Sequence, residues 1–435
     1  MAEKTELDLE ELTEVWGLLS PDDRLAGFRL LDPGEAEEFF FDLSARDQYE
    51  LLLALPTPER RLWLRTLAPD DAADVVQEAE DEERGQLLGL LDEPTRREVS
   101  ALLAYEEDAA GGLMSSRFAR LRPEMTVDEA ISYLRRQALS HIDVETIYYI
   151  YVLDQAQQLT GVVSFRELFS ERGDLVVRDV MRTDFVTVPE EMDQEAVARV
   201  MADNDIVAVP VVDAGGRMVG IVTVDDIVDV VEEEATEDVQ KYAGMAALEE
   251  PYLRTNFFEL IRKRVGWLSL LLVGEMLTAS VMAYFEGEMQ RALFLTTFVP
   301  LIISSGGNSG SQASTLVIRA LTLSEIRLRD WWRVMRRELA AGLTLGSILG
   351  AIGFFRVIAW DQIFPQAYPV VPMGVTVFFS LTGVVIFGTL AGSMLPLGLQ
   401  RLKFDPASAS APMVATLVDV MGLVIYFTVA SLLVL

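Results

Sequence analysis

Residues 411–435 read APMVATLVDVMGLVIYFTVASLLVL, an apolar stretch with one charged side chain, Asp419. A transmembrane helix needs about twenty predominantly apolar residues. Four more stretches meet this requirement, at 266–285, 292–318, 339–360 and 373–399. The sequence therefore predicts an α-helical membrane domain of five transmembrane helices over residues 263–435.

The rest of the chain has the opposite character. Residues 1–260 contain 59 Asp and Glu against 23 Lys and Arg, whereas residues 261–435 contain 9 against 13. The formal charges are thus −36 and +4. Such acidity argues against nucleic acid as a partner, because phosphates would be repelled. The chain has no Cys and one His, His141, which argues against zinc or His-based enzyme chemistry. We expect a protein that is not an enzyme.

Basic residues predict the orientation in the membrane, because they favour the cytoplasmic side. They precede the first stretch, lie between the second and third, and lie between the fourth and fifth; only Arg291 and Arg356 lie on the other side. We expect a multi-pass protein of the cytoplasmic (inner) membrane, with the soluble N-terminal half in the cytoplasm and the C-terminus outside. An odd number of spans indicates that a pore would need more than one subunit.

Three polar features interrupt the membrane stretches. Residues 306–312 read GGNSGSQ, and such residues either leave regular helix to line water or allow close helix packing. Asp419 is costly in lipid unless it faces an ion, water or a partner, so we interpret it as part of an ion pathway rather than as a structural residue. Glu275 would line the pathway, pair with a neighbouring span or stay protonated.

The soluble half contains two repeats. Within 1–105, helix-start signals such as Ser20-Pro21 and Asp32-Pro33 recur about every twelve residues, which predicts a superhelix of short helices. Residues 113–175 and 176–233 each follow a β-α-β-β-α order, and Asp154 and Asp213 lie 59 residues apart. These two copies resemble a tandem pair of α+β CBS domains. Residues 234–262 are interpreted as a helix that connects to the membrane domain.

Acids cluster at two places with the same spacing. Asp70, Asp71 and Asp74 lie in the first repeat, and Asp225, Asp226 and Asp229 in the second CBS-like copy. Acids four residues apart on a helix repel each other, and a hard divalent cation would relieve that repulsion. Oxygen ligands without thiolate favour Mg²⁺, Ca²⁺ or Mn²⁺.

The whole chain resembles the MgtE family of magnesium channels. The residues that carry the resemblance are YEEDAAGGLM at 105–114, ETIYYIYV at 145–152, GIVTVDD at 220–226, EATED at 234–238, GGNSG at 306–310 and PMVATLVD at 412–419. The resemblance implies a Mg²⁺-selective channel or transporter that imports Mg²⁺, works as a homodimer in the lipid bilayer and is gated by intracellular Mg²⁺. The pore would be lined by Gly306, Gly307, Asn308 and Asp419. The metal ligands that the resemblance implies are Asp419, Glu38, Asp70, Asp74, Glu195, Asp205, Asp226, Asp229, Glu234, Glu237 and Asp238.

The sequence departs from the family at two places. Ser311 stands where close relatives carry Asn. Members that bind ATP have an Arg-Asp pair and a stacking Phe, and here these positions hold Arg166-Glu167 and Ile206, although Tyr149 remains. A nucleotide site at Tyr149, Arg166 and Glu167 is thus a weaker expectation than Mg²⁺. The alternatives are a CBS-regulated carrier for Co²⁺ or Mn²⁺, and an intramembrane enzyme, which a single His argues against.

Overall fold

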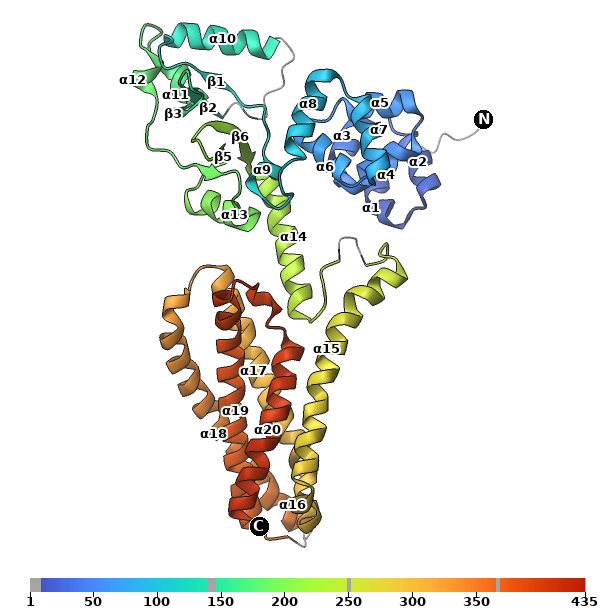
Figure 1. The fold of residues 1–435 in the computed structure, drawn as a ribbon, viewed down its shortest axis with the longest axis vertical. Helices are drawn as coiled ribbons and strands as arrows, with labels where there is room; N and C mark the ends of the chain where they lie inside the picture. The colour runs from blue at the N-terminus through green and yellow to red at the C-terminus, as the bar shows by residue number, and fades with distance from the viewer. Residues whose placement is uncertain (1–8, 140–145, 147, 249–251, 365–367, 435) are drawn as a thin grey trace. The chain divides into compact units, whose positions relative to one another are not determined.

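The computed structural model describes residues 9–139, 146, 148–248, 252–364 and 368–434. Within this part the chain divides into two compact units, Met1–Glu233 and Glu234–Leu435, which are treated separately below (Figure 1). His141 lies outside the described residues.

The first unit begins with a stack of short helices, as the sequence predicts. Ser20 and Ser44 accept hydrogen bonds from the backbone N–H groups of Asp23 and Asp47, and so cap two of the helices. The helices are α1 (Leu9–Val15), α2 (Pro21–Phe28), α3 (Pro33–Asp42), α4 (Ala45–Ala54), α5 (Thr57–Leu64), α6 (Pro69–Gln77), α7 (Asp81–Leu90) and α8 (Glu93–Leu102), with a 3₁₀ turn at Trp16–Leu18.

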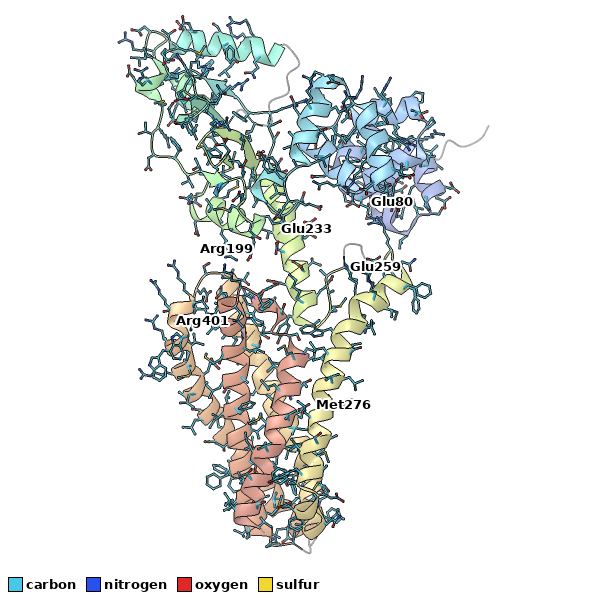
Figure 2. All side chains as sticks on the ribbon, viewed as in Figure 1. Glu80, Arg199, Glu233, Glu259, Met276 and Arg401 are labelled. Atoms are coloured by element: carbon cyan, nitrogen blue, oxygen red, sulfur yellow. The ribbon has the colours of Figure 1, made fainter. Side chains whose placement is uncertain are left out.

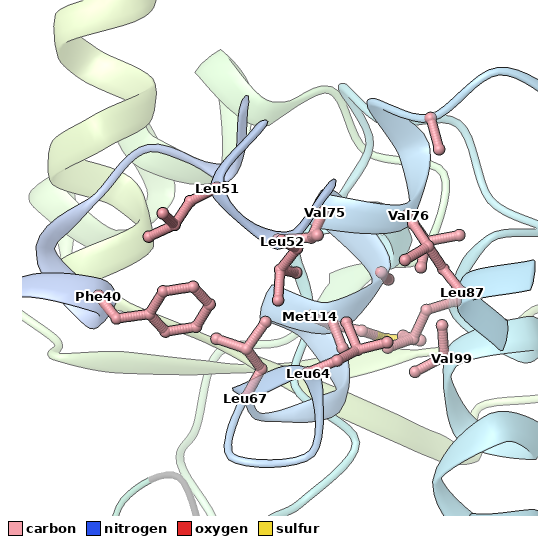
Figure 3. Close-up of a cluster of buried hydrophobic side chains, with 14 of the residues drawn as sticks. Phe40, Leu51, Leu52, Leu64, Leu67, Val75, Val76, Leu87, Val99 and Met114 are labelled. Atoms are coloured by element: carbon pink, nitrogen blue, oxygen red, sulfur yellow. The ribbon is translucent and has the colours of Figure 1, made fainter. Parts of the chain in front are cut away.

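One apolar core holds these helices together. Phe40, Leu52 and Leu64 are fully buried in it, and Figure 3 shows them with their neighbours. The same core continues through Met114 to residues of the second β-α-β-β-α copy, such as Val209. Burial of such side chains is the main source of stability, so the helical stack and this copy form one packed body.

The two CBS-like copies have the same topology. The first contains α9 (Ala110–Leu113), β1 (Arg120–Leu121), α10 (Val127–Leu139), β2 (Tyr149–Leu153), β3 (Leu159–Ser164) and α11 (Phe165–Ser170). The second contains α12 (Val177–Val180), β4 (Val188–Pro189), α13 (Gln194–Asp203), β5 (Ala208–Val212), β6 (Met218–Thr223) and α14 (Val224–Tyr242). In each sheet a parallel pair is followed by an antiparallel pair.

The register confirms the internal repeat. Tyr149 pairs with Ser164 in the first copy, and Ala208 pairs with Thr223 in the second. Each partner has moved by 59 residues, the spacing seen in the sequence. The last helix, α14, continues without a break past Glu233. The connecting helix is therefore the second half of α14 and ends at Tyr242, where Gly244 has a positive φ of 77°.

The second unit is helical. It contains α15 (Phe257–Tyr284), α16 (Glu286–Arg291), α17 (Val299–Thr322), α18 (Trp331–Ile363), α19 (Val370–Arg401) and α20 (Ala411–Leu433), with 3₁₀ segments at Leu293–Phe298, Leu328–Asp330 and Pro406–Ser408. Among the described residues, four helices are long and apolar enough to span a membrane: α15, α18 with its preceding turn, α19 and α20. The fifth expected span, α17, is 24 residues long but carries the polar GGNSGSQ stretch.

That stretch does not interrupt the helix. The sequence left open whether it breaks α17 or packs it closely, and α17 runs continuously from Val299 to Thr322. A Cβ atom placed on Gly310 would come 3.0 Å from the carbonyl oxygen of Gly388 in α19. The glycines of α17 are therefore needed for close approach of two helices.

Candidate functional site

The structure brings the acids of α6 and the first turn of α14 together within the first unit. Asp226 acts electrostatically on Asp74, and Asp70 acts on Asp226. Pro69 starts α6 and places Asp70 in its first turn. Asp226 accepts hydrogen bonds from the backbone N–H and the hydroxyl of Thr223, at 3.3 and 2.7 Å, and so caps α14. Residues more than 150 positions apart thus form one acidic cluster.

Asp70 is the most enclosed member of this cluster. Its side chain is buried, and its Oδ1 atom has no hydrogen-bond partner among the described residues. Burial raises the pKa of Asp70, although a hydrogen bond from Ser115 and the charge of Arg117 oppose the rise. A buried carboxylate oxygen without a partner is costly. Asp70 therefore offers an acceptor that a cation or its water shell would satisfy.

The other members repel each other. Burial raises the pKa of Asp74 to about 8, with Asp71, Asp70, Asp226 and Glu107 adding to the rise. Burial likewise raises the pKa of Asp226 to about 7, against the hydrogen bond from Thr223. Parts of Asp71 and Asp74 remain exposed, so water moderates the repulsion. The pKa values of Asp70, Asp71, Asp74 and Asp226 are all raised, so a positive charge beside these four carboxyl groups would be favourable.

Acids that the sequence did not assign to the metal site extend the cluster along α14. Burial raises the pKa of Glu233, with contributions from Asp229, Glu107 and Asp108; Glu233 is labelled on α14 in Figure 2. Glu107 also acts on Asp74. Glu107 and Asp108 lie in the YEEDAAGGLM motif, one of the motifs that carry the family resemblance. Their negative charge within this motif is the signal that could have identified them.

The acids of the cluster are not arranged as the coordination sphere of a metal ion. In the described part of the chain, no three His, Asp or Glu side chains come close enough to hold a metal ion. The donors are carboxylates without thiolate, which suits a hard cation such as Mg²⁺. Mg²⁺ usually keeps several waters, so carboxylates that are near one another without converging fit a hydrated ion better than a bare one.

Other residues of the expected metal set lie elsewhere. Glu38 is exposed on α3, Asp205 follows α13 with a φ of 52°, and Glu195 pairs with Arg199 on α13. Among the described residues, no hydrogen bond or ion pair joins these three to Asp70 or Asp226. Glu234, Glu237 and Asp238 belong to the second unit.

The end of α14 belongs to the second unit, here called the membrane unit, and contacts other elements of that unit. Lys241 lies 2.7 Å from Asp405 and 2.6 Å from Glu237. Burial lowers the pKa of Lys241, but these carboxylates outweigh it and raise the pKa above its usual value. The hydroxyl of Tyr242 donates to the backbone oxygen of Ser311 at 2.9 Å and lies 2.5 Å from the Oγ1 atom of Thr315. The sequence reading did not identify these contacts of Lys241 and Tyr242.

One face of α17 is polar and exposed in the single chain. Ser304, Asn308, Gln312 and Thr315 are exposed, whereas Gly306 and Gly310 are buried on the opposite face. Their spacing places the four polar residues on one side of the helix. We call them the polar face of α17. Polar side chains at membrane depth are costly against lipid and favour protein or water beside them.

Asp419 lies on α20, half-buried, next to α15. A hydrogen bond joins its carboxyl group to that of Glu275. Of the roles considered for Glu275, the structure shows pairing with a neighbouring span.

The expected nucleotide residues lie on β2 and α11. The carboxylate of Glu167 accepts hydrogen bonds from the backbone N–H and the hydroxyl of Ser164, at 3.0 and 2.8 Å, in the capping box of α11. It also accepts a hydrogen bond from Arg182. Burial raises the pKa of Glu167, but these partners outweigh it and hold the pKa below its usual value. Arg166 is exposed, and Tyr149 is partly buried. The acidic residue of this set is thus already used within the protein.

Comparison with known proteins covers both units. Family models match residues 7–108 (MgtE intracellular N domain), 110–174 and 177–233 (CBS domain) and 299–429 (MgtE, divalent cation transporter). The magnesium transporter MgtE of Thermus thermophilus is 43% identical, over 98% of this chain and 93% of the relative. That of Bacillus subtilis is 32% identical, over 90% and 84%.

A solved structure is also similar. It is the cytosolic domain of the Mg²⁺ channel MgtE in complex with ATP, 44% identical, covering 52% of this chain and 92% of that one with a TM-score of 0.48. The family models and the full-length relatives agree on the order of the domains. The chain therefore belongs to the MgtE family.

Proposed function

We propose that this chain forms a homodimeric, Mg²⁺-selective channel that imports Mg²⁺ across the cytoplasmic membrane. The name of the relative that shares 43% identity supports the ion. The polar face of α17 supports the dimer, because a second copy placed against it would enclose a polar path away from lipid. Asn308 lies on this face and would line the path, and Asp419 on α20 would supply its carboxylate. Gly306 and Gly307, which the resemblance also assigns to the pore, are buried against α19 and α20 and would support the path from behind.

We infer the orientation of the chain in the membrane from the positions of its basic residues. Arg262, Lys263 and Arg264 at the start of α15, and the arginines between α17 and α18, mark the cytoplasmic end. The first unit would then lie in the cytoplasm and the C-terminus outside. A cytoplasmic first unit exposes its acids to intracellular Mg²⁺.

One observation carries the gating proposal: α14 has the acidic cluster at its first turn and the Tyr242 contact at its last. Asp226 caps its start, and Tyr242 bonds to Ser311 and Thr315, the latter on the polar face of α17. The helix has 19 residues, or about 28 Å at 1.5 Å per residue. Charge changes at one end therefore act through a continuous helix on the other end.

Internal Mg²⁺ would act by neutralising the cluster. Glu234, Glu237 and Asp238, the acids of the connecting segment, would add ligands along α14. With Mg²⁺ bound between α6 and the first turn of α14, these elements stay together and the pore stays closed. When Mg²⁺ falls, repulsion separates them and α14 releases α17. An ion shifts such an equilibrium only by binding one state more tightly, so the closed arrangement must be the tighter binder. Glu38, Glu195 and Asp205 would join only after rearrangement.

The experiment is a Mg²⁺ current recorded from inside-out patches while Mg²⁺ on the cytoplasmic side is varied. Asp226→Asn keeps an acceptor for Thr223 and removes one charge, so we expect weaker inhibition by internal Mg²⁺. Asp203→Asn, an equal charge change at the exposed end of α13, should leave inhibition unchanged. Normal inhibition of the Asp226 variant would count against the cation site.

A carrier for Co²⁺ or Mn²⁺ is the second candidate, because the family model is described more broadly as a divalent cation transporter. Competition between these ions and Mg²⁺ in reconstituted vesicles separates the two. ATP would act as a further ligand only if Glu167 left Ser164 and Arg182.

A further inference from the structure

A cavity of about 540 Å³ lies in the membrane unit, between the beginning of α17 and the end of α18. It has apolar and aromatic walls and a single charged residue. Its lining residues are Phe294, Thr297, Phe298, Leu301, Arg356, Val357, Trp360 and Tyr368. Nothing in the proposed ion pathway uses these residues.

The residues around the cavity are of the kind expected where hydrocarbon gives way to headgroups. Arg356 is seven residues before the end of α18 at Ile363, which corresponds to about 10 Å along the helix. Leu301 is the third residue of α17. Trp360 and Tyr368 are of the types enriched at membrane interfaces, and Tyr368 stacks on Phe294 with centroids 4.8 Å apart.

Arg356 supplies the charge of the cavity. Its guanidinium lies 4.0 Å from the ring centroid of Trp360, a cation–π contact that fixes its position and leaves its N–H groups available. Within the described ranges, no hydrogen bond or ion pair involves Arg356. The adjacent Asp361 already has an interaction partner. The cavity thus offers one fixed cation beside an apolar wall.

We propose that this cavity binds one phospholipid, with the phosphate on Arg356 and an acyl chain along Phe298, Leu301 and Val357. A phosphodiester carries one negative charge, and a guanidinium binds it through two parallel hydrogen bonds. The volume lies in the range of sites that hold a small ligand. A free anion would leave the apolar wall uncovered, whereas a lipid uses both parts of the cavity.

Native mass spectrometry of the full-length protein in detergent, titrated with phosphatidylglycerol, tests this. Arg356→Ala should weaken the tightest lipid-binding step by at least about tenfold, the effect of one charge-assisted hydrogen bond. Arg401→Ala, which removes a charge at the opposite end of the membrane unit, should leave that step unchanged. Leu301→Trp keeps Arg356 but fills the cavity, and it should weaken the step as well.

Three results would overturn the proposal. The first is equal lipid affinity of wild type, Arg356→Ala and Leu301→Trp. The second is displacement of the lipid by millimolar inorganic phosphate, which would make the cavity a simple anion site. The third is a change in the number of subunits in both variants with lipid binding intact, which would assign the surface to a contact between copies.

Discussion

Replacing Asp226 by Asn should stabilise the first unit in the absence of Mg²⁺. The amide keeps an oxygen that accepts from Thr223, so the cap of α14 survives, while the charge that repels Asp70 and Asp225 is removed. Asn also has no carboxyl group to protonate. The substitution therefore separates the electrostatic cost of the cluster from its hydrogen bonds.

The size of the effect follows from the pKa of Asp226. Burial, with repulsion by Asp225 and Asp70, raises it from 3.8 to about 7. A raised pKa means that the folded state holds the proton more tightly than the unfolded state. Its stabilising contribution is complete below pH 3.8, declines as the pH rises to about 7, and is lost above that. Three units at about 1.4 kcal/mol each give about 4 kcal/mol, and partial exposure of Asp226 reduces this to about 2 kcal/mol.

Hydrogen exchange of the full-length protein in detergent measures this directly. At pH 7.5 without Mg²⁺, the opening free energy of amides in α6 and the first half of α14 should rise by about 2 kcal/mol in Asp226→Asn. Mg²⁺ should then add less protection to the variant than to wild type. Asp203→Asn should behave as wild type. Lower protection in Asp226→Asn, or an undiminished response to Mg²⁺, would refute the view that repulsion within the cluster destabilises this unit.

Three further substitutions test the membrane unit. Asp419→Ala should abolish Mg²⁺ uptake into vesicles while size-exclusion chromatography still shows a folded protein; retained uptake would exclude Asp419 from the pore. Tyr242→Phe removes the hydrogen bonds to Ser311 and Thr315, which contribute about 1 kcal/mol. Channel current at high internal Mg²⁺ should therefore increase about fivefold. An unchanged current would mean that this contact does not hold the channel closed. Gly392→Ala places a methyl group against a backbone oxygen of α17. We expect the free energy of unfolding to fall by about 1–3 kcal/mol, seen as a lower melting temperature. An unaltered melting temperature would show that the helices can separate without cost.

Much of the architecture was predictable because local patterns specify it. Ser20-Pro21 and Asp32-Pro33 predict helix starts because their first residue can cap a helix. The 59-residue spacing between the two β-α-β-β-α copies predicts two sheets with the same topology. The path of α17 was not predictable, because Gly306 and Gly310 permit both a broken helix and close packing. The close approach of α19 to these glycines decides in favour of a continuous, closely packed α17.

The candidate site was predictable in part. Repeated acidic spacing identified Asp70, Asp74 and Asp226, and the fold places them together. Glu107 was missed because its effect on Asp74 depends on packing that brings the segment between α8 and α9 near α6. Tyr242 was missed for a similar reason: its hydroxyl finds partners about seventy residues later, and no local pattern encodes so distant a contact.

The continuity of α14 also constrains how the length of this segment can vary. Each residue advances the helix by about 100°, so one inserted residue between Asp226 and Tyr242 would turn the tyrosine ring away from Ser311 while leaving every side chain present. Seven inserted residues would restore its direction to within about 20° but shift it along the axis by two turns. The rotational phase between the two ends of α14 is therefore a property as specific as any residue in it.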